Sequence, residues 1–277
     1  MKVTVVIPTW NSMPAFKNTL ESVRTEIPIV DLDEIIIVDK NSVDGTVETA
    51  TEFAVKHNLP IRIIIEEGTL GMARMRGVQE AKTDWIAFVD SDVELCKGWF
   101  SKLQEYITVD TGWVFGNLLD THPLLRAEQE YRIRLKRGDE LKVIERGERA
   151  YTHNALCRRA PILDVDISAM NAWEDYVLAQ AMLAAGYKIK QVPVISLHIK
   201  ETEINEHEEA WGMPGIIKTK GRLYAFFRMF YWVWWGIRTS GHFRNPWYFS
   251  HNFKIFSHQF HAFLFPKHFF ESKRGEK

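Results

Sequence analysis

The sequence has little cysteine and no uninterrupted hydrophobic run of the roughly 20 residues that a membrane-spanning helix needs. Its 277 residues include two cysteines, Cys96 and Cys157. Two thiols cannot build a disulfide framework, and no Cys-x-x-Cys pair indicates a zinc site, so we expect a reducing compartment and two inert thiols. The chain passes from Met1 into a strand-like run without the apolar stretch and cleavage site of a signal peptide, so none is expected.

Acidic residues are scarce at the end of the chain. The formal net charge of −1 averages two unlike parts, because residues 211–277 hold 11 basic and 2 acidic residues while the first 210 hold 24 and 34. The same 67 residues hold 20 of the 35 aromatic side chains. We therefore expect a globular body over residues 1–210, followed by a basic, aromatic and helical extension over residues 211–277.

The body alternates strand-like and helix-like segments. Short β-branched or continuously apolar runs predict strands at residues 3–7, 34–39, 61–65, 85–90, 113–115 and 189–194. Apolar residues at helical spacing predict helices at about 14–24, 45–57, 73–81, 98–107, 124–137 and 174–185, and the dense charge of residues 136–149 predicts a solvated loop. Strands joined by helices in this order favour an α/β fold with a doubly wound parallel sheet.

Polar side chains follow three of the predicted strands at the point where each strand ends. They are Thr9, Asp39, and the pair Asp90 and Asp92. Ligands of open parallel sheets bind beyond this edge. Two carboxylates so close together repel unless a cation lies between them, and hard divalent cations are often held by one or two carboxylates plus substrate phosphates. The pair therefore indicates a metal and diphosphate site, whereas Asp39 alone could equally be a helix cap.

Five motifs occur along the body in a fixed order. They are Val5-Val-Ile-Pro-Thr-Trp-Asn11, Ile37-Val-Asp-Lys-Asn-Ser-Val-Asp-Gly-Thr46, Gly71-Met-Ala-Arg74 with Gly77, Phe88-Val-Asp-Ser-Asp92, and Trp173-Glu-Asp175 before a helix that ends at Gly186. Together they resemble the inverting family 2 glycosyltransferases, which use nucleotide sugars and have the GT-A fold. The resemblance covers about residues 1–200. One departure is that residues 153–159 replace a glycine-rich segment of the family.

The resemblance implies a GT-A fold, a Rossmann-like mixed sheet, and a set of donor-binding residues. Pro8, Thr9 and Asp39 would line the nucleoside pocket. Further donor contacts would come from Gly71, Arg74, Asp90 and Ser91, with Arg74 facing the diphosphate.

The resemblance also implies a metal site and a general base. Asp90, Asp92 and His198 would approach a divalent cation, Mn²⁺ or Mg²⁺. The second carboxylate of Glu174 and Asp175 would remove the proton of the acceptor.

These residue types suit the chemistry independently of the family. Charge grows on the leaving phosphate when a sugar is displaced, and a cation together with Arg74 can stabilise it. A carboxylate such as Asp175 can accept the proton of an attacking hydroxyl, although a phosphate acceptor would need it only for positioning. The alternatives are an acidic pair that favours a helix N-terminus, a structural His198, and Arg74 as an ordinary surface cation.

The extension has the pattern of a membrane-surface helix. One helical face carries the apolar residues Leu223, Phe226, Phe227, Phe230, Tyr231 and Trp234. After a break at residues 241–246, a second aromatic stripe consists of Phe253, Phe256, Phe260 and Phe263. A helix over residues 223–237 would be about 22 Å long, too short to span, and it contains Arg228. Aromatic residues with flanking cations favour the headgroup region, and no nucleic-acid module is present. Packing on the body or a dimer interface is the alternative.

We therefore expect a metal-dependent enzyme that moves a hexose, with inversion, from a UDP- or GDP-linked sugar. The acceptor would be lipid-linked or membrane-proximal, such as a polyprenyl or dolichyl phosphate or a growing glycan. The enzyme would be peripheral or monotopic on the cytoplasmic side of the cell membrane, docked through residues 212–270. The rival hypotheses are a transferase that makes a soluble glycoside and oligomerises through its extension, and a non-catalytic nucleotide-binding scaffold at the membrane.

Overall fold

A computed structural model describes residues 1–136, 138–199, 204 and 206–266. It divides into two compact units, Met1–Ala169 with Asp175–Thr202, and Met170–Glu174 with Glu203–Lys277, and each is described by itself. The last residue of the helix predicted at 124–137 lies outside the described residues. So do residues 267–277 of the predicted extension.

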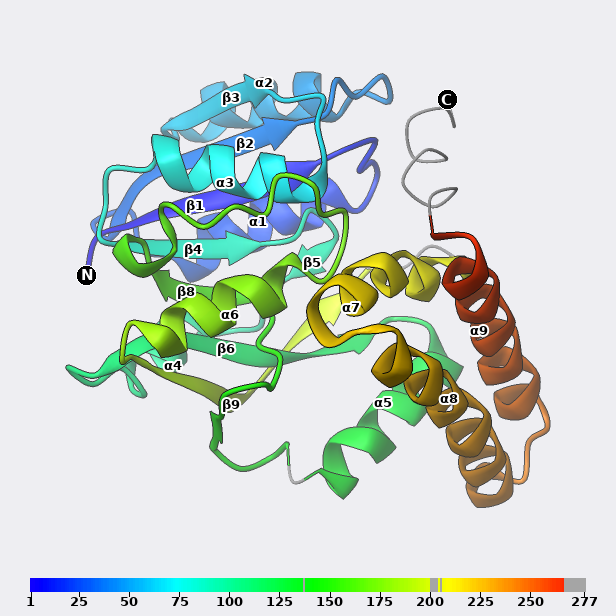
Figure 1. Cartoon of the computed structure of the whole chain (residues 1–277). Coiled ribbons are helices and arrows are strands. Elements are labelled where there is room, and N and C mark those ends of the chain that lie inside the picture. The colour runs from blue at the N-terminus through cyan, green and yellow to red at the C-terminus, as the bar shows by residue number, and fades with distance from the viewer. Residues whose placement is uncertain (137, 200–203, 205, 267–277) are drawn as a thin grey trace. The chain divides into compact units, whose positions relative to one another are not determined.

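The first unit is built on a mixed nine-stranded sheet (Figure 1). Its strands are β1 (Val3–Thr9), β2 (Leu32–Asp39), β3 (Ile61–Ile65), β4 (Trp85–Val89), β5 (Val93–Glu94), β6 (Thr111–Asp120), β7 (Lys142–Ile144), β8 (Asn154–Arg158) and β9 (Lys188–His198). The order is β3-β2-β1-β4-β8-β6-β9-β5, and β7 pairs with β9. The first four strands are parallel, as predicted, and β8 runs against its neighbours β4 and β6.

Helices cover both faces of this sheet, because successive residues of a buried strand point to opposite sides. Val3, Val5 and Ile7 of β1 belong to the hydrophobic core on one face of the sheet. This core also contains buried residues of α1 (Phe16–Glu26) and α4 (Trp99–Gln104). The opposite face carries α3 (Leu70–Glu80) and α6 (Glu174–Ala184), as Figure 1 shows, and α2 (Thr46–His57) contacts α1 and β3. The α3 helix lies so close to β1 that a Cβ atom on Gly77 would come within 2.3 Å of Val6.

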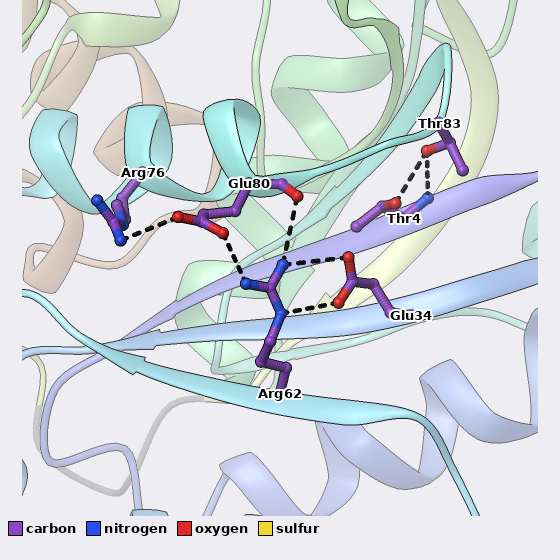
Figure 2. Close-up of polar contacts among 6 residues, drawn as sticks. All are labelled: Thr4, Glu34, Arg62, Arg76, Glu80 and Thr83. Atoms are coloured by element: carbon purple, nitrogen blue, oxygen red, sulfur yellow. Dashed lines mark hydrogen bonds and ion pairs between the residues drawn. The ribbon is translucent and has the colours of Figure 1, made fainter.

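An ion-pair network joins α3 to the amino ends of the parallel strands (Figure 2). Arg62 of β3 donates to Glu34 of β2 at 2.9 Å and to Glu80 of α3 at 2.7 Å. Nearby, the Thr83 hydroxyl accepts the backbone N–H of Thr4 at 2.9 Å. These groups hold the sheet at the edge opposite to the one where the strands end.

Predictions for the strands after β5 were partly wrong. The loop predicted over residues 136–149 contains β7, which pairs with β9, so that prediction was wrong for Lys142–Ile144. The strand predicted at 113–115 extends through Gly116 and Asn117 to Asp120, and β8 was not predicted. Glycine and asparagine are unfavourable in most strands, but here Asn154 accepts the Gly116 N–H at 2.8 Å and Asn117 donates to the carbonyl of Gly138 at 2.9 Å.

The second unit is helical. It contains η2 (Glu206–Gly212), α7 (Met213–Lys220), α8 (Arg222–Phe243) and α9 (Trp247–Leu264). The α8 and α9 helices pack closely, since a Cβ atom on Gly236 would come within 2.9 Å of the Asn252 Cβ. The α8 helix has 22 residues and extends past the predicted 223–237 at both ends, so the predicted bounds were wrong. Within the described residues, no helix is both long and apolar enough to cross a membrane.

The two cysteines are shielded. Cys157 is buried in β8 and Cys96 is partly buried. Burial raises the pKa of both thiols, which agrees with the expected inertness.

Candidate active site

The candidate site lies at the carboxyl edge, which we define as the edge where the parallel strands end. Thr9, Asp39, Asp120 and His198 are the last residues of β1, β2, β6 and β9. Asp90 follows β4 directly, and its N–H donates to the carbonyl of residue 153, just before the antiparallel β8, at 3.1 Å. The topology thus brings side chains from five parallel strands and one antiparallel strand to one edge.

Asp39 is fully buried and holds the turn after β2. Its carboxylate accepts the Thr9 hydroxyl at 2.7 Å, the Ser42 backbone N–H at 2.7 Å and the Ser42 hydroxyl at 2.6 Å. These bonds close the turn from Asp39 to Ser42. Asp39 is not a helix cap, because α2 begins at Thr46 with Gly45 at its N-cap position. Pro8 is buried beside it in β1.

Arg74 is not a surface cation. Its side chain is 4% exposed, and Nη2 donates to Asp90 at 2.6 Å, while the Asp90 carboxylate is 33% exposed. The expected repulsion between Asp90 and Asp92 is therefore relieved by protein groups, since each carboxylate has its own cationic or imidazole partner. Between them Ser91 shares a hydrogen bond of 2.8 Å with Ser12.

Gly71 is buried in the first turn of α3. The helix begins at an N-cap, Thr69, whose hydroxyl accepts the Met72 N–H at 3.1 Å. This cap fixes the start of the segment that carries Gly71 and Arg74.

His198 lies between two carboxylates. Nε2 is 2.9 Å from Asp92 Oδ2, and Nδ1 is 3.2 Å from Asp120 Oδ1. Burial disfavours the charged ring, but the hydrogen bonds with Asp120 and Asp92 outweigh that effect and raise the pKa of His198 to about 10. The predicted pair of Asp92 and His198 does meet, and Asp120 is a third member that the sequence analysis missed, because the predicted strand stopped at residue 115.

His153 is a further missed residue at this edge. Its Nδ1 is 3.0 Å from the side-chain amide of Asn154, and its ring stacks on Tyr151 with centroids 5.3 Å apart. Burial lowers the pKa of His153 to about 3, and the negative charge of Asp175 acts against that shift. Charges from other parts of the site also reach the ring and lower its pKa further; they belong to His198, Arg149 and Arg74.

The candidate general base, Asp175, is buried and paired with a cation. Arg149 Nε donates to both carboxylate oxygens at 2.8 and 2.9 Å, and the Arg149 guanidinium lies over Tyr151 at 4.8 Å. Arg149 falls in the segment predicted as a solvated loop, so sequence reasoning did not find it. Glu174, the first residue of α6, is also buried and belongs to the second unit.

Among the described residues, no group of three or more His, Cys, Asp or Glu side chains is arranged to hold a metal ion alone. Asp92 and His198 offer one oxygen and one nitrogen. With phosphate oxygens to complete the set, this donor pair suits Mn²⁺ better than Mg²⁺, because Mg²⁺ prefers oxygen ligands alone. The residues at this edge therefore fit a cation that is shared with a phosphorylated ligand.

Residues 4–161, more than half of the chain, match the profile described as Glycosyl transferase family 2. The chain belongs to this family. The family assignment agrees with the resemblance of the motifs at the carboxyl edge.

Curated relatives match over part of their length. The chain is 34% identical to the uncharacterized glycosyltransferase YibD of Escherichia coli over 96 residues, which are 34% of this chain and 27% of that protein. It is 29% identical to the dolichol-phosphate mannosyltransferase of Pyrococcus furiosus over 134 residues, 46% of this chain and 37% of that protein. The match thus spans well under half of these relatives.

Solved structures share the fold. The mannosyltransferase PcManGT of Pyrobaculum calidifontis, in complex with GDP-Man and Mn²⁺, has a TM-score of 0.62 and 17% identity, over 92% of this chain and 73% of that one. TarS 1-349 of S. aureus, in complex with UDP-GlcNAc, has a TM-score of 0.54 and 17% identity, over 79% and 66%. These similarities confirm the predicted GT-A architecture.

Proposed function

We propose that this chain transfers a hexose, with inversion, from a nucleoside diphosphate sugar to an acceptor, and that a divalent cation assists the reaction. The observation that carries the proposal is the meeting of Asp92 and His198 at the carboxyl edge of a family 2 sheet. Membership in the family supports the reaction class. Two solved structures that share the fold are complexes with GDP-Man and with UDP-GlcNAc, which supports a nucleotide-sugar donor.

On the donor side, the chain would bind the nucleoside near Pro8, Thr9 and Asp39 and the diphosphate near Asp92 and His198. A bound cation would neutralise the charge that grows on the leaving diphosphate. Arg74 holds Asp90 in place at 2.6 Å, so the partly exposed carboxylate of Asp90 is a fixed hydrogen-bond acceptor for a donor hydroxyl. Gly71 and Ser91 would complete this surface.

On the acceptor side, Asp175 would take the proton of the attacking hydroxyl, with Glu174 beside it in sequence. Attack from the face opposite to the leaving group inverts the anomeric carbon. Arg149 holds both oxygens of Asp175 through one Nε–H, which fixes the plane of the carboxylate. This strong pairing also favours a second version of the reaction, in which the acceptor is a phosphate and Asp175 only positions it.

Binding of a donor can be tested before the sugar is known. A panel of UDP- and GDP-sugars is added to the full chain, with Mn²⁺ or with a chelator, and the melting temperature is measured. We expect one nucleotide class to stabilise the protein, more strongly with Mn²⁺, because a ligand that binds only the folded state raises its stability. If no nucleotide sugar shifts the melting temperature under either condition, the proposed donor site is wrong.

The role of Asp175 is tested by Asp175→Asn. With a hydroxyl acceptor we expect turnover to fall by about 10²- to 10⁴-fold with little change in donor affinity, because only proton removal is lost. With a phosphate acceptor the loss would be far smaller. A hydroxyl acceptor that reacts equally fast with the variant would contradict a base role.

We further propose that the second unit docks on an anionic membrane surface. One side of the α8 and α9 pair, the aromatic face, exposes two stripes of apolar side chains: Leu223, Phe227, Phe230, Trp234 and Ile237 on α8, and Phe249, Phe253, Phe260 and Leu264 on α9. Phe230 meets Phe256 with ring centroids 5.5 Å apart, so the stripes are continuous. An exposed apolar surface of this extent marks an interaction site.

The positive charge of these helices favours an anionic lipid surface as the partner. Residues 211–266 contain seven basic residues and no acidic one. Two of the cations lie against aromatic rings of these helices, with Arg238 5.4 Å from the Trp234 ring and Arg222 4.6 Å from the Phe263 ring. Aromatic rings flanked by cations suit the headgroup layer of anionic lipids. The acceptor would then be lipid-linked or membrane-proximal, on the cytoplasmic side, with residues 212–270 as the docking segment.

A further inference from the structure

Asp120 lies behind His198, on the side away from Asp92. The two residues are register partners in the parallel pairing of β6 and β9, and the Thr121 N–H donates to the carbonyl of His198 at 3.0 Å. On its other side His198 pairs with Val93 of β5. Strands on both sides therefore fix the backbone of His198. One carboxylate near its ring, Asp120, is the last residue of β6, and the other, Asp92, immediately precedes β5.

The two carboxylates differ in exposure. The side chain of Asp120 is 4% exposed, whereas that of Asp92 is 43% exposed. The Nδ1 side of the ring therefore faces the interior, and the Nε2 side faces the part of the carboxyl edge that a ligand can reach. Burying a carboxylate is costly unless it is well paired, so the buried position of Asp120 calls for partners on both oxygens.

The second oxygen of Asp120 is held by α5 (Pro123–Leu135). The side-chain amide of Gln129 donates to Asp120 Oδ2, and Gln129 Oε1 accepts the Asp120 backbone N–H at 2.6 Å. Gln129 thus forms hydrogen bonds with both the main chain and the side chain of Asp120. The carboxylate cannot rotate away from His198 without losing the hydrogen bond from Gln129 to Oδ2.

A cation that binds Nε2 would displace the proton that this nitrogen shares with Asp92. The neutral imidazole that remains carries one proton, and the position of that proton decides which nitrogen binds the cation. A hydrogen bond from Nδ1–H to a carboxylate keeps the lone pair on Nε2 and orients the ring. Asp120 is placed to accept that hydrogen bond, and Nε2 faces Asp92.

We propose that Asp120, supported by Gln129, is a positioning residue that holds His198 in the tautomer and orientation in which Nε2 binds a divalent cation together with Asp92. The proposal rests on the cation site of the proposed function. It adds two residues, from β6 and α5, that the motifs do not contain.

The test is Mn²⁺ binding to the full chain, measured by the electron paramagnetic resonance signal of free Mn²⁺, alone and with UDP or GDP. Asp120→Asn can turn its amide N–H toward Nδ1 and so favour the wrong tautomer. We expect Mn²⁺ affinity to fall by about 10- to 100-fold. Gln129→Met, which removes both bonds to Asp120, should give a smaller loss of Mn²⁺ affinity. This variant tests the proposal if Asp120→Asn does not fold.

Asp110→Asn is the matched control. Asp110 immediately precedes β6 and pairs with Lys188, the first residue of β9, at 2.6 Å, so it joins the same two strands at their other end. We expect its Mn²⁺ affinity to equal that of the wild type. A second readout separates positioning from a general loss of structure, because electron spin-echo modulation from an imidazole nitrogen bound to Mn²⁺ should be present in the wild type and lost in Asp120→Asn.

The outcomes distinguish this proposal from the proposed function. If Asp92→Asn weakens Mn²⁺ binding while Asp120→Asn stays within twofold of the wild type and keeps the nitrogen modulation, the positioning role is wrong and the metal site stands. If Asp92→Asn also leaves Mn²⁺ binding unchanged, both the metal site and the positioning role are wrong. Nucleotide binding with a chelator present reports on the donor site independently.

Discussion

His153 is kept neutral by its place in the fold. Its pKa falls to about 3 through burial, whereas an unfolded histidine titrates near pH 6.5. Between these two values the unfolded chain binds more protons at this residue than the folded chain does. Stability from this residue is therefore present above about pH 6.5 and is lost as the pH falls toward 3.

This gives a prediction for His153→Gln, whose amide can still accept from Asn154. Urea unfolding at pH 7 and pH 5, with a chelator present, should show that the wild type loses more stability on acidification than the variant. The comparison cancels the carboxylates that both proteins share. Parallel losses in the two proteins would show that His153 is not held neutral.

Individual side chains were predictable where a motif and a strand end coincide. Asp92 and His198 were assigned to one site from sequence, and the structure brings them together. Arg74 was assigned near the donor, yet no pattern indicated that it is buried and paired with Asp90. The sequence did not predict that Asp120 and Arg149 belong to the site. Their positions depend on the end of β6 and on the course of a loop, which are set by contacts between residues far apart in the sequence.

At the scale of the element, the contact between α3 and β1 positions the helix that carries Gly71 and Arg74. It depends on Gly77, because a Cβ atom there would lie 2.3 Å from Val6 Cγ1, well inside the normal contact distance. Val6 is fully buried in β1 and Gly77 is buried in the helix that packs on it, so the two cannot move apart easily in a closely packed core.

We expect Gly77→Ala to destabilise the protein by about 1–3 kcal/mol, the usual cost of overpacking a core. Val6→Ala removes the methyl groups that the new Cβ would meet, so the same change should cost less in that background. Chemical denaturation of the four proteins in this cycle measures the coupling. Equal costs in both backgrounds would contradict the contact.

The elements themselves differ in how far the sequence determined them. The four parallel strands were predicted because each is a short run of β-branched or apolar residues, most of them closed by a turn or a polar residue. The strands β7 and β8 were not, because β7 lies in a charged segment and pairs by its backbone with β9, and β8 begins with the buried Asn154. Tertiary pairing overrides local composition in these segments.

At the scale of the whole molecule, charge and aromatic residues are divided between the two parts of the chain. The first 210 residues have an excess of acid and include the site carboxylates, and the rest is basic and aromatic. This division was read from the sequence, whereas the continuity of the aromatic face across α8 and α9 required the fold.

Membrane docking predicts that Phe227→Ser and Trp234→Ser weaken binding to vesicles. The two side chains are 65% and 52% exposed on the aromatic face. Burying an aromatic side chain contributes about 1.5–3 kcal/mol, so each change should lower partition on phosphatidylglycerol-containing vesicles by about tenfold or more, with less binding at high salt. Vesicle flotation measures this.

The matched controls are Val43→Ser and Val109→Ser, which remove exposed apolar side chains from the first unit. We expect both to float like the wild type. Equal flotation of all variants would exclude the membrane role of this face. If the same variants instead dissociate an oligomer in sedimentation, the face is an interface between copies.

The central claim is that the carboxyl edge transfers a sugar from a nucleoside diphosphate donor with help from a cation at Asp92. The most direct test is release of UDP or GDP from nucleotide sugars by the full chain with Mn²⁺ and acceptor-containing vesicles, comparing wild type with Asp92→Asn and Asp110→Asn. We predict release by the wild type and by Asp110→Asn, and a drop of about 10²-fold or more for Asp92→Asn. Release that is unchanged in Asp92→Asn, or absent from the wild type with every common donor, would contradict the claim.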